Sequence, residues 1–118
     1  MNSTAKPAEP GIDIRKLNPE TTILLEADPY LYEMRVVYPI HGIVEISSSD
    51  PALGVPTVGQ VLHSRHWSSP SAPIPLWIGR GFALDIRFRN GVYRTQPIMA
   101  ASVSGKRHDG SRWSYEVF

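Results

Sequence analysis

Arginine side chains carry the clearest chemical signal in this chain of 118 residues. Arg87, Arg89 and Arg94 lie on either side of the dipeptide Asn90-Gly91, within the alternating stretch 82–96. Asn-Gly predicts a two-residue hairpin turn, because both central positions of a type I′ turn need a positive φ. Folded on that turn, the stretch places the three arginines on one face. The planar fork of arginine binds carboxylate and phosphate well, so this face is a candidate anion-binding site.

The same turn predicts which residues of the hairpin oppose each other. Arg87 is expected to face Arg94, a like-charge pair that costs roughly a few tenths of a kcal/mol. Asp85 on a diagonal, an aromatic ring between the guanidinium planes, or a bound anion could relieve this repulsion. The other face of the hairpin is apolar and should pack on the core through Leu84, Ile86, Phe88 and Tyr93.

Arg65, in the predicted strand 58–67 beside Trp67, could extend this basic face, as could Lys106, Arg107 and Arg112. Together with Trp67, Trp77 and Trp113 they interleave basic and aromatic residues, a pattern typical of small barrels that bind single-stranded nucleic acid by stacking and charge neutralisation. In the alternative interpretation, the tryptophans belong to the core and the arginines form a solvated surface. We therefore predict a ligand-binding face made of Arg87, Arg89, Arg94, Arg65 and Trp67.

The sequence gives little support to catalytic or metal-binding chemistry. The chain has no cysteine, which excludes thiolate nucleophiles and cysteine-ligated metals. His63 and His66 are three residues apart on a predicted strand, so their side chains should point to opposite faces. The carboxylates are dispersed, no serine lies in a nucleophile elbow, and Gly79-Arg80-Gly81 lacks the residues of a phosphate loop. We predict a protein without catalytic activity, cofactor or metal.

Charge is divided unevenly between the two halves of the chain, although the formal net charge is only +1. Residues 1–58 contain four basic and eight acidic side chains, a net charge of −4, whereas residues 59–118 contain eight basic and three acidic ones, a net charge of +5. Such asymmetry favours an anionic partner or head-to-tail association. One function class is a binding module that engages nucleic acid or an acidic protein surface through the arginine face. The other is a self-assembling scaffolding protein, a homo-oligomer that joins the acidic and basic halves of neighbouring copies.

Short alternating segments separated by turn residues indicate an all-β fold. Eleven prolines and nine glycines disfavour long helices. We predict a small barrel or sandwich of about six or seven mostly antiparallel strands. In residues 30–38, alternation should place Tyr30, Tyr32, Met34, Val36 and Tyr38 on one face. The last segment should turn Trp113, Tyr115 and Val117 inward. The expected strand regions are residues 22–26, 30–38, 43–48, 58–67, 82–96, 98–104 and 112–118.

The ends of the chain suggest a simple organisation. Residues 1–11 are polar, contain prolines and show no periodicity, which predicts a disordered N-terminal tail. Residues 12–118 are expected to form a single β-rich domain. The N-terminal stretch lacks the apolar core of a signal peptide, and no apolar run is long enough to cross a membrane. We therefore expect a cytoplasmic protein without a membrane partner.

Overall fold

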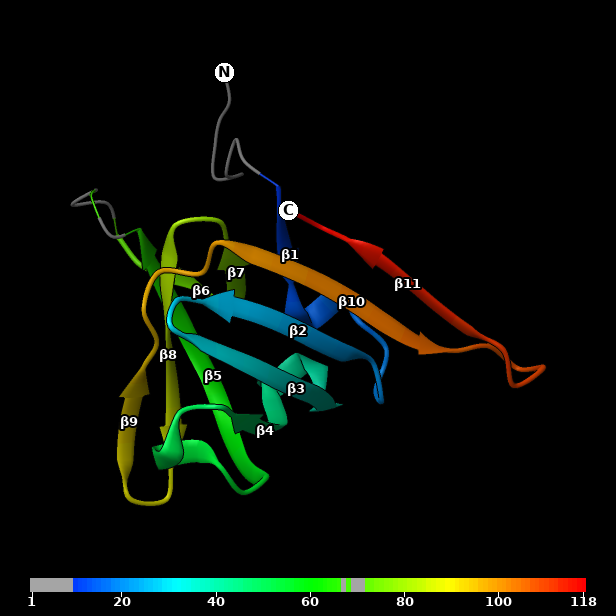
Figure 1. Cartoon of the computed structure of the whole chain (residues 1–118), viewed down its shortest axis with the longest axis horizontal. Helices are drawn as coiled ribbons and strands as arrows, with labels where there is room; N and C mark the ends of the chain where they lie inside the picture. The colour runs from blue at the N-terminus through cyan, green and yellow to red at the C-terminus, as the bar shows by residue number, and fades with distance from the viewer. Residues whose placement is uncertain (1–9, 67, 69–71) are drawn as a thin grey trace.

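The computed structural model describes residues 10–66, 68 and 72–118, and these form an antiparallel β fold (Figure 1). The strands are β1 (Gly11–Asp13), β2 (Thr22–Ala27), β3 (Tyr30–Tyr38), β4 (Ile43–Ser48), β5 (Thr57–His66), β6 (Ile74–Pro75), β7 (Trp77–Gly79), β8 (Phe82–Phe88), β9 (Gly91–Arg94), β10 (Ala100–Lys106) and β11 (Arg112–Glu116). Three short 3-10 helices connect them: η1 (Ile14–Lys16), η2 (Pro39–His41) and η3 (Pro51–Leu53). In the described part of the chain, no helix is long and apolar enough to cross a bilayer.

The strands form two sheets, one of them much larger than the other. The large sheet has nine strands in the order β11-β10-β2-β3-β4-β5-β8-β9, with β6 beside β5, and the small sheet pairs β1 with β7. The predicted tail, residues 1–11, lies outside the described residues except for Pro10 and Gly11, and Gly11 begins β1. Trp67 of the predicted binding face also lies outside them.

The all-β prediction is confirmed, but the large sheet is open rather than closed into a barrel. Its end strands, β9 and β11, do not pair with each other in the described structure. After β9 the chain stays beside β8, where the Thr95 and Ile98 N–H groups donate to β8 carbonyls. It then crosses to β2, and β11 is added outside β10. The last two strands therefore widen the sheet instead of closing it.

Period-two alternation places the core on one face of the sheet. Facing residues of four neighbouring strands form an apolar row across it, Val103–Ile23–Met34–Ile46, and all four are buried. Burial of each such side chain contributes roughly 1.5–3 kcal/mol to stability. The predicted alternation of residues 30–38 holds as far as Val36, after which a shift in register leaves Tyr38 exposed.

The prediction for the last strand is only partly correct. Tyr115 lies opposite Val103 and therefore points to the core-facing side of the sheet, yet it is 60% exposed. Trp113 is half-buried and packs against the edge of the core. The reason is the position of β11 at the end of the sheet, where alternation continues but the core does not.

A chain of hydroxyl groups joins β3 to β9 across the core-facing side of the sheet. The hydroxyl oxygens of Tyr32 and Tyr93 are 2.7 Å apart, and the Tyr93 hydroxyl donates to the carboxylate of Asp50. Because the proton of Tyr93 is directed to Asp50, Tyr32 must donate to Tyr93. Burial is the main cause that raises the pKa of both tyrosines. Asp50 also accepts the Ala52 N–H at 3.0 Å, so the same carboxylate caps η3.

Replacing Tyr93 by phenylalanine tests this link. The change removes one hydroxyl and takes a hydrogen-bond partner from Tyr32, which is only 2% exposed. We expect the free energy of unfolding to fall by about 1–3 kcal/mol. The matched control is Tyr115→Phe, which removes an exposed hydroxyl and should leave stability nearly unchanged. Urea titrations of both variants measure the difference, and equal midpoints would contradict a structural role for the link.

Candidate functional site

The β8–β9 hairpin that carries the arginines forms with a different register from the predicted one. Phe88 faces Gly91, so the two-residue loop is Arg89-Asn90 rather than Asn90-Gly91. Gly91 has a positive φ of 143°, but Asn90 is not among the residues with a positive φ, so the expected type I′ turn does not form. The shift is two residues, and each side chain therefore keeps its predicted face.

The observed register replaces the predicted like-charge pair by an attractive one. Arg94 faces Asp85, whereas Arg87 faces Val92, so the expected Arg87–Arg94 opposition is wrong. The Arg94 guanidinium donates from Nε and Nη2 to the two carboxylate oxygens of Asp85 at 2.7 and 3.1 Å. The attraction between Asp85 and Arg94 favours this register over the one that the Asn-Gly signal alone predicts.

His63 on β5 completes the surroundings of the Asp85 carboxylate. Its Nε2 lies 2.9 Å from Asp85 Oδ2. An ionised carboxylate only accepts hydrogen bonds, so Nε2 carries the proton. Asp85 is 4% exposed, and the hydrogen bonds from Arg94 are the main cause that lowers its pKa, against the opposing effect of burial. Asp85, Arg94 and His63 thus come from three neighbouring strands, and both oxygens of the buried carboxylate accept hydrogen bonds.

The predicted arginines all lie on the outer side of β5, β8 and β9 or in the turn between β8 and β9. Arg65 faces Ala83 and shares with Arg94 a shallow pocket of about 390 Å³, also lined by Gln96. Arg87 donates to the Gln60 side-chain oxygen at 2.8 Å. We call Arg65, Arg87, Arg89 and Arg94 the arginine face.

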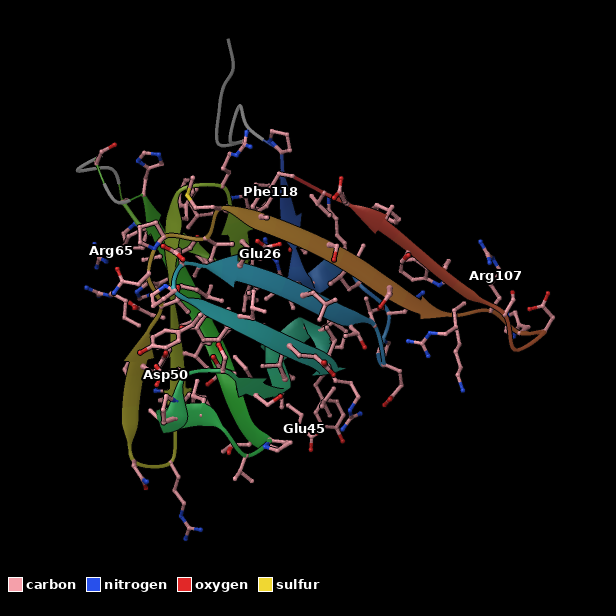
Figure 2. All side chains as sticks on the ribbon, viewed as in Figure 1. Glu26, Glu45, Asp50, Arg65, Arg107 and Phe118 are labelled. Carbon is pink, nitrogen blue, oxygen red and sulfur yellow. The ribbon has the colours of Figure 1, made fainter. Side chains whose placement is uncertain are left out.

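Two of the three tryptophans that were expected to lie among the arginines, Trp77 and Trp113, are not on the arginine face. Trp77 belongs to β7 in the small sheet, and Trp113 belongs to β11 at the opposite end of the large sheet from β9. Figure 2 shows the same separation for two arginines, with Arg65 on one side of the molecule and Arg107 on the other. The described residues therefore provide guanidinium groups without the interleaved tryptophans expected from the sequence.

Sequence reasoning missed the pairing of His63 with Asp85. The sequence shows both residues, but their contact depends on the pairing of β5 with β8. That pairing includes an irregularity between Val61 and His63. His63 and His66 do lie at opposite-face spacing, as predicted, and no group of three metal-ligating side chains assembles in the described parts of the chain. Chemically, the arrangement holds one guanidinium and one imidazole in fixed positions at the surface.

Asp85→Asn tests the charged cluster. The change keeps the shape of the side chain but removes its charge, and Arg94 is 60% exposed, which limits the loss. We expect the free energy of unfolding at pH 7 to fall by about 1–2 kcal/mol. Because the pKa of Asp85 is lowered in the folded state, its contribution is complete at neutral pH and is lost as the pH falls through the ordinary range of an aspartate, about 4, toward the folded value.

The pH dependence separates this effect from a general loss of packing. Denaturant midpoints measured from pH 7 to pH 3 should fall less steeply for Asp85→Asn than for the parent protein. Glu33→Gln, at an exposed carboxyl on β3, provides the control and should leave the pH profile close to that of the parent. Identical profiles for all three proteins would show that Asp85 contributes no charge interaction to stability.

Known proteins provide no guide to this surface. Comparison of the chain with protein-family models, with curated proteins and with solved structures found no match. The function has to be argued from the residues themselves.

Proposed function

We propose that the protein is a non-catalytic binding module that engages an anionic partner, nucleic acid or an acidic protein surface, through the arginine face. One observation carries the proposal. Arg65, Arg87 and Arg94 lie on the outer side of the neighbouring strands β5, β8 and β9, and Arg89 lies in the turn between β8 and β9. Of these four arginines, only Arg94 forms an ion pair within the described residues. Three guanidinium charges are therefore left for a ligand.

The neutralised arginine has a different role from the other three. Asp85 holds the Arg94 guanidinium by two hydrogen bonds, so the group is oriented before any ligand arrives. Arg65 borders the same shallow pocket. An anion in this pocket would meet one guanidinium held by Asp85 and one that forms no ion pair within the described residues, and a planar fork suits both phosphate and carboxylate. Arg87 and Arg89 would add further contacts along an extended polyanion.

The ion pair between Arg94 and Asp85 decides which arginines are suitable for mutation. An acidic residue at position 94 would face Asp85 and disturb the fold, so a loss of binding would be ambiguous. Arg65 and Arg87 are exposed, and neither forms an ion pair within the described residues. Arg65→Gln and Arg87→Gln therefore remove charge from the face with little effect on stability.

Binding to a labelled single-stranded oligonucleotide and to poly-glutamate tests the proposal. Each variant should bind more weakly than the parent. For the oligonucleotide, the plot of log affinity against log salt has a negative slope, and this slope should become less steep by about 0.7 for each lost phosphate contact. Arg107→Gln, on the other side of the molecule, is the matched control and should bind like the parent. A preference for one ligand identifies the partner class. No salt-dependent binding to either polyanion, or equal losses in all three variants, would refute the proposal.

The alternative function, self-assembly through acidic and basic halves, is favoured by a separate observation. Glu26 and Glu33, on the outer face of β2 and β3, are exposed and form no ion pair within the described residues. The outer surface thus has an acidic region apart from the arginine face. Head-to-tail association of these regions would produce oligomers that dissociate at high salt, which light scattering at two salt concentrations would detect.

A further inference from the structure

Within the described residues, the outer edge of β11 pairs with no other strand, and its side chains form an unusual pattern. The strand reads Arg112-Trp113-Ser114-Tyr115-Glu116 and pairs with β10 on one side only. Figure 1 shows it in red at the border of the large sheet. Exposed strand edges readily pair with another strand, so proteins usually protect them. The other border strand, β9, has only four residues and includes Arg94.

The backbone hydrogen bonds of β11 show which of its residues direct their N–H and C=O groups away from β10. Val117 N–H donates to the Ala101 carbonyl at 2.9 Å, and the Ser111 carbonyl accepts from Arg107 N–H at 2.7 Å. In an antiparallel ladder, alternate residues direct both backbone groups to the same side. Ser111 and Val117 face β10, so Arg112, Ser114 and Glu116 direct their N–H and C=O groups to the open side. The Arg112 carbonyl also accepts from Arg107 Nη1 at 3.2 Å, which leaves the second lone pair of this oxygen for a partner strand.

The side chains of β11 are divided by the sheet into two sets. Trp113 and Tyr115 lie on the core-facing side and stack on each other, with ring centroids 5.7 Å apart and an angle of 25° between the planes. Tyr115 is 60% exposed. Arg112, Ser114 and Glu116 lie on the other side and are exposed. The edge thus combines accessible aromatic surface with one charge of each sign at its two ends.

We propose that two copies of this chain pair through β11, antiparallel and about a two-fold axis at Ser114. In this register Arg112 faces the partner subunit's Glu116, and Trp113 faces the partner subunit's Tyr115. The residues that exchange backbone hydrogen bonds are then Arg112, Ser114 and Glu116, the same three that direct their backbone groups outward. Hydrogen bonds, aromatic packing and charge are therefore satisfied together.

Neighbouring registers do not share these properties. A shift of the partner by two residues in either direction keeps the backbone pattern but places Arg112 or Glu116 opposite a serine, and the two opposite charges no longer meet. A shift by one residue sets outward-facing groups against inward-facing ones. Only the register centred on Ser114 pairs the charges at both ends. This interface lies at the other end of the sheet from the arginine face and does not depend on the proposed anion binding.

Charge reversal at Arg112 and Glu116 tests the proposal. The molar mass of the parent and of each variant is measured by sedimentation or light scattering over a wide concentration range. Arg112→Glu and Glu116→Arg should each be monomeric where the parent is dimeric, because like charges then meet at both ends of the interface. An equimolar mixture of the two variants should recover the dimer, since every facing pair is again opposite in sign. The double variant Arg112→Glu/Glu116→Arg should also dimerise. A parent protein that remains monomeric, or a dimer unaffected by either reversal, would overturn the proposal.

A single cysteine provides a second test that does not depend on charge. The chain has no cysteine, so Ser114→Cys introduces one thiol at the two-fold axis. Facing hydrogen-bonded residues have Cα atoms about 5.5 Å apart, within the range of about 4.4–6.8 Å that a disulfide spans. Mild oxidation should cross-link two copies of this variant. The control is Ser104→Cys, which lies beside Ser114 on β10 but away from the axis. Equal cross-linking of the two variants would contradict the interface.

Discussion

The position of Arg94 within the arginine face depends on one buried charge, the carboxylate of Asp85. A carboxylate at 4% exposure is unfavourable unless its oxygens are paired, and β8 runs between two strands that can provide partners. His63 from β5 and Arg94 from β9 satisfy it at 2.9 and 2.7 Å. The same contacts set the register of the hairpin and fix the direction of one guanidinium. Alternation along β5 and β8 places Arg65 and Arg87 on the same outer side, and Arg89 lies in the turn between β8 and β9.

Polar contacts on both faces hold β9, a border strand of only four residues. On the outer face Arg94 binds Asp85, and on the inner face Tyr93 joins Tyr32 to Asp50. Both carboxylates act in their ionised form, and the hydrogen bond from Tyr93 is the main cause that lowers the pKa of Asp50. A short strand with little buried apolar surface thus gains its order from directional bonds. It can therefore present a basic side chain to solvent without loss of position.

Local patterns predicted the faces of this protein well, and long-range pairing limited the rest. Alternation placed Tyr32, Met34 and Val36 inward, and it separated the arginines from Ile86 and Tyr93. The Asn-Gly signal predicted the hairpin but not its register, because a turn preference of local origin competes with the attraction between Asp85 and Arg94. The His63–Asp85 contact required knowledge of strand order. The exposure of Tyr115 required knowledge of where the core ends, which period-two alternation does not contain.

The two proposals involve opposite ends of the same sheet and differ in the kind of interaction they use. The arginine face offers charge of one sign to a ligand, so its affinity should depend on salt and on the length of the anion. The β11 edge has one charge of each sign, and these charges act through their positions, since they match only in the self-complementary register. A dimer paired through β11 would also have two arginine faces, one on each copy. A long polyanion could then contact both, and the second contact would be intramolecular, which raises the overall affinity without any new contact within either copy.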